Sequence, residues 1–399
     1  MGMATTANSS LLFVLPALAL AIAVVASAAP AAASPAAAPN KPSPFRTVYA
    51  FGDSFTDTGN TRSTTGPYSF GYVSSPPYGA TFFHRSTNRY SDGRLVVDFL
   101  AQALSLPTFL PPYLSAAANA SAEAAADDEV GVNFAVAGAT AIEHDFFAKN
   151  NLSIDITPQS IMTQLGWFDA HLRSGGRAKS SSKVGDALFW VGEIGANDYA
   201  YTVVARDTIP PKLVRTMAVQ RVTTFVEGLL ERGAKYLIVQ GLPLTGCLPL
   251  AMTLARPEDR DNVSCVASVN RQSYAHNRRL LAGLHQLRQK HPDAVIAYAD
   301  YYAAHLAVMR SPARYGFTEP FRTCCGSGGG AYNFDLFATC GSPEVNTSCA
   351  QPAKYVNWDG VHMTEAMYKV VAGMFFQGGD TYCRPAFTDL LVRKAQGKP

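Results

Sequence analysis

The sequence lacks any concentration of charge of one sign. Its 399 residues contain 33 Lys and Arg against 30 Asp and Glu, a formal net charge of +3, and these charges are scattered along the chain. Proteins that bind a phosphate backbone need clustered positive charge, so this distribution argues against nucleic acid as a partner. The 48% hydrophobic content and the lack of a long charged run also argue against general disorder, because they allow a large core.

Charge is missing altogether from the first forty residues. Residues 11–26 read LLFVLPALALAIAVVA, which predicts a secretory signal peptide over residues 1–28, followed by a Pro/Ala-rich linker over residues 29–44. Cleavage is expected near Ala26-Ser27-Ala28. Because the apolar run has no basic residues before it and approaches the length of a membrane span, an uncleaved anchor is the alternative. No later segment is long and apolar enough to span, so we expect no stable membrane span after cleavage.

Cysteine is absent from the N-terminal half of the chain. The seven cysteines are Cys247, Cys265, Cys324, Cys325, Cys340, Cys349 and Cys383. No C-x-x-C pair occurs, and the adjacent Cys324 and Cys325 suit a tetrahedral zinc site poorly. We therefore expect disulfides with one thiol left over, and no metal. Cys247 and Cys265, across a short loop, form the natural pair, while the other pairings stay open.

Four N-x-S/T acceptor sequences outside the leader agree with the secretory route. They predict N-glycosylation at Asn119, Asn151, Asn262 and Asn346.

Short apolar segments alternate with helical patterns along the rest of the chain. Five segments predict buried parallel strands, because they are apolar on both faces: Thr47–Phe51, Val132–Ala137, Ala187–Val191, Tyr236–Gln240 and Val295–Ala299. The main helices are expected over residues 91–106, 215–233 and 267–291. This alternation predicts an α/β fold: a single three-layer domain over residues 45–390, with a doubly wound parallel sheet flanked by helices.

Polar and glycine residues follow three of the predicted strands. Ser54 comes after the first strand, Gly138 after the second and Asn197 after the third. Ligands gather at the carboxyl ends of the strands in such a sheet, so these residues are expected at one rim. A hydroxyl, a flexible backbone amide and a side-chain amide are the components of a serine nucleophile with an oxyanion hole.

A carboxylate and a histidine stand close together near the C-terminus, in the sequence NWDGVHMTEAMY. Asp359 and His362 are three residues apart, and Gly360 between them permits a tight bend. This spacing can place the carboxylate beside its histidine, where it fixes the tautomer and stabilises the imidazolium. His144, with an acidic residue on each side, is the rival base.

Four blocks occur in order: FGDSFTDTGN, NFAVAGATA, GANDY and WDGVHMTEA. Together they resemble the conserved blocks of the plant-type GDSL esterase/lipases, within the SGNH hydrolase superfamily, which has a flavodoxin-like fold. The resemblance covers residues 45 to about 385. Phe55 stands where the name-giving motif has leucine, and because this side chain would pack and not react, we expect no loss of activity from it.

The resemblance implies a role for each residue that matches a block. Ser54 is the expected nucleophile, His362 the base and Asp359 its orienter, and no cofactor takes part. The expected oxyanion donors are the backbone amides of Ser54 and Gly138 and the side chain of Asn197. The residues expected to serve only as loop hydrogen-bonders or close-packing positions are Asp53, Asp57, Asn60 and Gly195.

The expected function is therefore that of a serine carboxylester hydrolase that works through an acyl-enzyme. The resemblance is to the branch with sinapine and acetylajmalan esterases and xylan deacetylases, which implies an O-acetyl esterase acting on cell-wall polysaccharide such as xylan. An esterase of small acylated metabolites is the alternative, followed by a lipase or an acyltransferase. The aromatic segment at residues 68–78 is expected to form a platform for sugar or phenolic rings.

Other classes fit less well. A retaining glycosidase would need two acids about 5 Å apart, and the carboxylates near Ser54 are too few and unsupported for that. A binding module that has lost catalysis would show a broken block, whereas all four are intact. We expect a monomer in the extracellular space or cell wall, or in the Golgi lumen if the leader is retained as an anchor.

Overall fold

A central sheet of six strands carries the fold of the part of the chain that the structure describes. Its order is β2-β1-β3-β4-β5-β8, and every neighbouring pair is parallel except β5 with β8. The strands are β1 Val48–Phe51, β2 Gly131–Asn133, β3 Leu188–Val191, β4 Tyr236–Gln240, β5 Val295–Ala299 and β8 Cys383–Arg384. A separate parallel pair joins β6 Glu319–Thr323 to β7 Tyr355–Asn357.

This computed structural model describes residues 43–61, 71–115, 130–152, 157–174, 181–203 and 209–398. The predicted signal peptide, almost all of the linker, the acceptor Asn119 and residues 68–70 of the aromatic segment lie outside the described residues. The boundaries predicted for the domain, 45 and 390, stay a prediction.

Helices cover both faces of the sheet, which makes three layers. Residues that alternate along β1, such as Ala50 and Phe51, belong to two separate apolar clusters, one on each face. The first face is covered by α2 Val96–Ala103, α9 Pro249–Leu254, α11 Tyr301–Arg310, α12 Glu365–Gln377 and α13 Phe387–Ala395. The second is covered by α4 His144–Lys149, α5 Ile161–Ser174, α6 Ser181–Asp186, α7 Ala196–Val203, α8 Pro211–Glu231 and α10 Ala267–Lys290.

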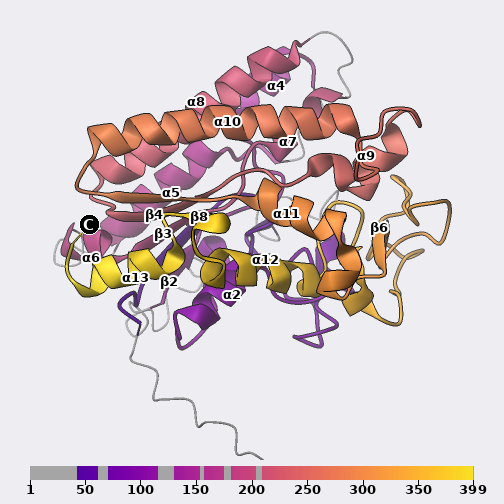
Figure 1. Ribbon diagram of the computed structural model, residues 1–399, viewed down its shortest axis with the longest axis horizontal. Coiled ribbons are helices and arrows are strands. Elements are labelled where there is room, and N and C mark those ends of the chain that lie inside the picture. Colours follow the sequence, from indigo (N-terminus) through magenta and orange to yellow (C-terminus); the bar gives the residue numbers. More distant parts are fainter. Residues whose placement is uncertain are drawn as a thin grey trace, which may run out of the picture. The chain divides into compact units, whose positions relative to one another are not determined.

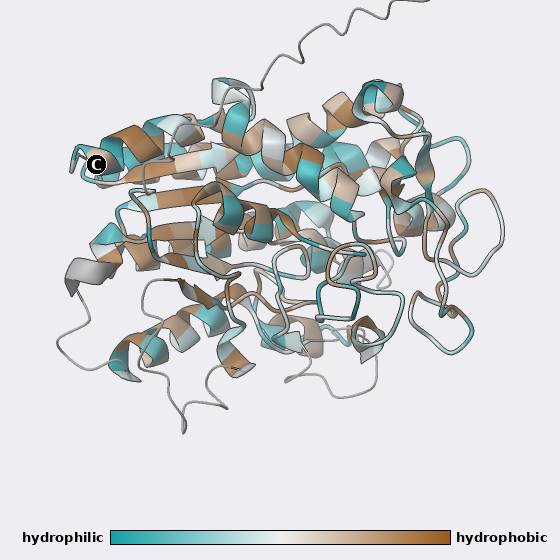
Figure 2. Ribbon diagram, turned by 90° about the horizontal axis from the view of Figure 1, so that it is seen from below, coloured by the Kyte–Doolittle hydropathy of each residue, from teal (hydrophilic) through white to brown (hydrophobic). Residues whose placement is uncertain are grey.

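The pictures show the same layering. In Figure 1, α8 and α10 lie on one side of the strands, and α12 and α13 lie on the other. Figure 2 shows the strands largely in hydrophobic brown, as expected for strands that are buried on both faces. The predicted α/β fold with a doubly wound parallel sheet is therefore confirmed.

The second strand differs from its prediction. It begins at Gly131 and ends at Asn133, whereas the apolar pattern predicted a strand up to Ala137. The Asn133 side chain accepts a hydrogen bond from the Ala135 N–H at 2.9 Å and donates one to the Thr56 carbonyl at 2.6 Å. The segment after Asn133 still runs beside the end of β1, because the Phe134 N–H donates to the Ala50 carbonyl at 2.7 Å and the Val136 N–H donates to the Gly52 carbonyl at 3.3 Å.

Two helices also differ from their predicted limits. The helix α2 begins at Val96, not at Ser91, because Asp98 accepts the Leu95 N–H at 2.9 Å, which caps the helix there. The helix α8 begins at Pro211, where proline fits the first helical turn. The third predicted helix is confirmed as α10, over Ala267–Lys290.

Three disulfides lie in the C-terminal half. Cys247 pairs with Cys265, as predicted, while Cys324 pairs with Cys349 and Cys325 with Cys340. Cys383 is the remaining thiol, and it is buried. Within the residues described, no helix is both long and apolar enough to cross a membrane.

Candidate active site

The three strand ends singled out from the sequence are neighbours in the sheet. β1 lies between β2 and β3, and all three run parallel, so their carboxyl ends meet at one edge. The chain order reverses at β1, because β2 lies on one side of it and β3 on the other. Such a switch point is where ligands bind in open α/β sheets. Ser54, Gly138 and Asn197 therefore share one rim.

Ser54 lies in a tight turn directly after β1. The turn is held by Asp53, whose carbonyl accepts the N–H groups of Thr56 at 3.0 Å and Asp57 at 2.9 Å, and whose Oδ1 accepts the Phe55 N–H at 3.0 Å. Ser54 itself is only 5% exposed. Across the described residues, no hydrogen bond engages the Ser54 N–H or its hydroxyl. The turn thus fixes the serine backbone while it leaves both groups available for a substrate.

Asp57 ties this turn to the segment that carries Gly138. Its Oδ1 accepts the Gly59 and Asn60 N–H groups, both at 2.7 Å, and its Oδ2 accepts the Ala137 N–H at 2.9 Å. Asp57 and Asn60 are therefore loop hydrogen-bonders, as predicted. These bonds hold two strand ends in a fixed relation to each other.

Gly138 adopts a backbone angle that favours glycine. Its φ is +78°, and its carbonyl accepts the Tyr201 hydroxyl at 2.9 Å. Its N–H makes no hydrogen bond with another described residue. The geometry therefore leaves the Gly138 N–H free, like that of Ser54.

Asn197 lies in the first turn of α7. Its Nδ2 donates to Asp53 Oδ2 at 3.0 Å and to the Ala139 carbonyl at 2.9 Å. Two acceptors engage the two hydrogens of this amide, so protein groups hold its orientation. Gly195, just before the helix, is the predicted close-packing glycine: a Cβ there would lie 2.9 Å from His276 Cε1.

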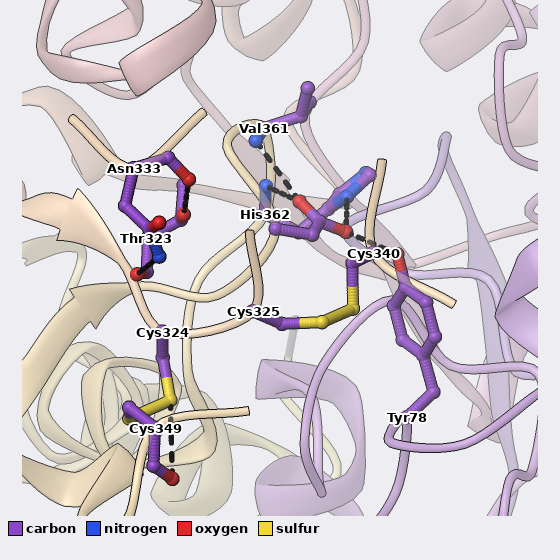
Figure 3. Close-up of a disulfide and its surroundings, with 10 residues drawn as sticks. Tyr78, Thr323, Cys324, Cys325, Asn333, Cys340, Cys349, Val361 and His362 are labelled. Atoms are coloured by element: carbon purple, nitrogen blue, oxygen red, sulfur yellow. Dashed lines mark hydrogen bonds and ion pairs between the residues drawn. A yellow bond between two sulfur atoms is a disulfide. The ribbon is translucent and has the colours of Figure 1, made fainter. Parts of the chain in front are cut away.

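Asp359 and His362 form a buried hydrogen-bonded pair. His362 Nδ1 lies 2.8 Å from Asp359 Oδ2, and the side chains are 4% and 6% exposed. Asp359 Oδ1 also accepts the Val361 N–H at 3.0 Å and the His362 N–H at 2.8 Å (Figure 3). Burial alone would raise the pKa of Asp359, but the charge of His362 and these hydrogen bonds together lower it.

Tyr78 is a further partner of this carboxylate, and the sequence pattern did not indicate it. Its hydroxyl donates to Asp359 Oδ2 at 2.8 Å, and the side chain points toward the His362 loop in Figure 3. Tyr78 is 5% exposed, so it does not belong to the exposed ring platform predicted for residues 68–78. The two residues are 281 positions apart, so no local spacing could have paired them.

The bend between Asp359 and His362 depends on Gly360. This residue has φ +96°, and a Cβ there would lie 2.2 Å from the ring of Phe334. Phe334 belongs to the loop closed by the Cys325–Cys340 disulfide, and the Cys325 N–H donates to the Trp358 carbonyl at 2.8 Å. The disulfide-bonded loop therefore braces the histidine loop from outside (Figure 3).

The His362 ring packs beside the serine turn. Its Nε2 is buried and has no hydrogen-bond partner in the described residues. Phe55, the residue after Ser54, packs with its ring centre 5.5 Å from that of His362, and Tyr90 packs at 4.6 Å. The rival base His144 is the first residue of α4, and none of the four donors to Asp359 comes from it.

No metal site accompanies this arrangement in the part of the chain that the structure describes. No group of three or more His, Cys, Asp or Glu side chains there could hold a metal ion.

A buried serine turn at a switch point, free backbone N–H groups and an aspartate–histidine pair are components that serine hydrolases of the α/β class use. The GDSL-like lipase/acylhydrolase family profile matches residues 48–374. The chain belongs to this family, and it is a carboxylic ester hydrolase.

Relatives match over nearly their whole length. A GDSL esterase/lipase of Arabidopsis thaliana is 53% identical over 95% of this chain and 97% of its own. Acetylajmalan esterase 2 of Rauvolfia serpentina is 39% identical over 82% of this chain and 88% of its own. Among solved structures, an extracellular lipase of Streptomyces rimosus aligns with 65% of this chain and 82% of its own. The identity is 14% and the TM-score is 0.28.

Proposed function

We propose that Ser54, His362 and Asp359 form the catalytic triad of this ester hydrolase. The observation that supports it best is the buried Asp359–His362 pair at 2.8 Å: the outer nitrogen has no hydrogen-bond partner among the described residues, and the ring packs against Phe55, the residue after Ser54. Asp359 fixes the proton on Nδ1, which leaves Nε2 as the base.

The reaction follows from this arrangement. Ser54 Oγ attacks the ester carbonyl carbon while His362 Nε2 takes the hydroxyl proton. The tetrahedral intermediate collapses, the C–O bond to the alcohol breaks, and His362 returns the proton to the departing alcohol oxygen. Water then attacks the acyl-Ser54 ester, with His362 again as base, and releases the acid.

The free N–H groups of Ser54 and Gly138 are the proposed oxyanion donors, and the Asn197 side chain is the third. Donors that are fixed before the reaction stabilise the charge that develops on the carbonyl oxygen. The two backbone groups make no hydrogen bond with the described residues, so no such bond has to break when they bind the oxyanion. Asn197 must redirect one of its two N–H bonds.

The proposed substrate is a short acyl ester, namely an O-acetyl group on a cell-wall polysaccharide such as xylan. Ser54 is 5% exposed and His362 3%, and such restricted access favours a small acyl group. The N-terminal leader and the three disulfides support a secreted protein. Three of the proposed glycosylation acceptors are exposed: Asn151, Asn262 and Asn346. In this proposal the secreted protein acts on the polysaccharide in the cell wall, as a monomer.

An esterase of small acylated metabolites is the second candidate. The printed name of the Rauvolfia relative, acetylajmalan esterase, favours an acetyl group on a small alcohol. This candidate shares the triad and the acyl group and differs only in the alcohol. A lipase or an acyltransferase comes after it.

Acetate release from two substrates separates these candidates. Purified, glycosylated protein is incubated with acetylated xylan and, in parallel, with a monoacetylated phenol, and acetate is followed by NMR. We expect release from xylan, with none from the Ser54→Ala variant. Release from the phenolic ester beside untouched xylan would favour the metabolite esterase. Rapid hydrolysis of long-chain acylglycerols with no acetate release would overturn both.

A further inference from the structure

Two buried carboxyl groups lie beside the serine turn, and the acylation chemistry uses neither of them. Asp53, which precedes Ser54, is 1% exposed, and Glu193 is 0% exposed. β1 and β3 pair Phe51 with Val191, and the Gly192 N–H continues the ladder to the Phe51 carbonyl at 2.8 Å. When this register is continued for two residues beyond Phe51 and Val191, Asp53 lies opposite Glu193.

Two glycines let these strand ends approach each other. A Cβ at Gly52 would lie 3.3 Å from Gly192 Cα, and one at Gly192 would lie 2.1 Å from Thr56 Oγ1. With the backbones this close, the buried carboxyl groups of Asp53 and Glu193 are neighbours, and each shifts the pKa of the other. The contact is therefore a consequence of strand register.

Asp53 accepts more hydrogen bonds than Glu193 does. Asp53 Oδ1 accepts the Phe55 N–H, and its Oδ2 accepts Asn197 Nδ2, each at 3.0 Å. Neither carboxyl oxygen of Glu193 accepts a well-formed hydrogen bond among the described residues, and the Ala196 N–H is the one backbone donor near enough to favour its charged form. Two ionised carboxylates cannot hydrogen-bond to each other, and a second buried charge without a donor is costly. A proton on Glu193 resolves both difficulties.

Burial and the neighbouring carboxylates also favour a proton on this pair of carboxyl groups. Burial is the main cause that raises the pKa of Asp53, to about 6, and the pKa of Glu193 well above its usual range. The pair also faces further ionisable groups: Asp57, Asp198, His362, Tyr301 and Tyr368. Asp57 and Asp198 favour retention of a proton, whereas the Glu193 side chain, the Phe55 N–H and His362 favour ionisation of Asp53.

We propose that Glu193 and Asp53 share one proton in the folded protein at neutral pH, and that this pair positions the side-chain amide of Asn197. The second part rests on the proposed role of Asn197 as an oxyanion donor. Glu193 and Asp53 are positioning residues, because neither touches the reacting atoms.

The shared proton gives Asp53 an intermediate strength as an acceptor. A fully ionised Asp53 would hold the Asn197 N–H too strongly for the oxyanion to compete, because hydrogen bonds to charged groups are the strong ones. A neutral Asp53 would leave the amide poorly oriented. With the Glu193 proton on its other side, Asp53 orients the amide and still releases one N–H to the developing charge.

Three variants test the proposal in the full-length protein. Glu193→Gln keeps a donor toward Asp53 but cannot ionise, and Glu193→Leu has a similar size but no donor. Glu365→Gln is the matched control, because Glu365 is also buried but is ion-paired with Arg94 at 2.7 Å.

The first readout concerns the proton and does not depend on activity. In the infrared spectrum at neutral pH we expect Glu193→Gln to lose a carboxylic-acid C=O band, and Glu365→Gln to keep it. The second readout is the free energy of unfolding against pH. Unfolded Glu193 releases its proton near pH 4.5, whereas the folded state retains it. Between roughly pH 5 and 7 this group therefore lowers the folded-to-unfolded ratio by up to about tenfold per pH unit, and Glu193→Gln removes that slope.

The third readout is turnover. We expect Glu193→Gln to keep kcat within about threefold of wild type, and Glu193→Leu to lose between about 10- and 100-fold in kcat with KM little changed, because a misplaced donor acts on the transition state. An unchanged kcat in a folded Glu193→Leu variant would overturn the positioning role.

Failure of this inference is distinguishable from failure of the proposed function. If Glu193→Gln has the wild-type infrared band and pH slope while Ser54→Ala is inactive, the shared proton is wrong and the triad stands. If Ser54→Ala remains active while the band and slope change as expected, the triad is wrong and the shared proton stands.

Discussion

The Tyr78 hydroxyl donates a 2.8 Å hydrogen bond to Asp359 Oδ2, the same oxygen that faces His362 Nδ1. The phenol and the imidazole thus compete for one atom of the carboxylate. Burial, followed by the nearby negative charge of Asp359, raises the pKa of Tyr78 well above its usual range, so the phenol remains a donor throughout the working pH range. Tyr78 therefore moderates the charge that Asp359 presents to the histidine.

Replacing Tyr78 with phenylalanine tests this relationship. Without the phenol, Asp359 presents more negative charge to the imidazole and is less firmly oriented. We expect kcat to fall about tenfold, and the acidic limb of the kcat/KM profile to move to higher pH. Tyr90→Phe, which leaves the ring packed on His362, is the matched control. A lower kcat with an unmoved acidic limb would mean that Tyr78 has only a packing role.

Ser54→Ala and His362→Ala test the triad as a unit. Each single change is expected to lower kcat on the order of 10⁴–10⁶, and the double variant is expected to be hardly worse than either. The reason is that the base has no proton to take once the nucleophile is gone. Single-turnover kinetics on a chromogenic acetate ester measure all three variants. Losses that multiply in the double variant would show that the two residues act independently.

Asn197→Ala tests the side-chain oxyanion donor. The amide meets charge that develops only in the transition state, so we expect kcat to fall by about 10²–10³ while KM stays nearly constant. Steady-state kinetics give both constants, and thermal unfolding shows whether the loss of the bonds to Asp53 and Ala139 has weakened the fold. A change confined to KM would place Asn197 in substrate binding instead.

Asp98→Ala tests the support beneath the Tyr78–Tyr90 segment. Arg89 donates to both oxygens of Asp98 at 2.8 Å, and the side chains are 8% and 1% exposed. Removal of the carboxylate leaves a buried guanidinium unpaired, so we expect a loss of about 3–5 kcal/mol in the free energy of unfolding. Denaturant titration measures it.

The matched control for Asp98→Ala is Glu143→Ala. That change removes the exposed ion pair of Glu143 with Arg221, in which both side chains are about 40% exposed. We expect it to cost less than about 1 kcal/mol. Equal losses in the two variants would contradict the importance of burial.

The sequence by itself determined the features that depend on local order. Short strands that are apolar on both faces and alternate with helices are typical of a buried parallel sheet, so the α/β fold and four of its five predicted strands followed from residue pattern. Asp359 and His362 are three residues apart around a glycine, so their contact also followed from spacing. The pairing of Cys247 with Cys265 also followed from their separation of 18 residues along the chain.

Only the tertiary structure decided the contacts between distant segments. The Asn133 side chain bonds to the Thr56 carbonyl only once β1 and β2 are adjacent. Tyr78 reaches Asp359 because folding brings the two loops together across 281 positions. Asp53 and Glu193 meet because the register of β1 on β3 places them opposite each other, and no spacing along one chain segment encodes a register between two strands.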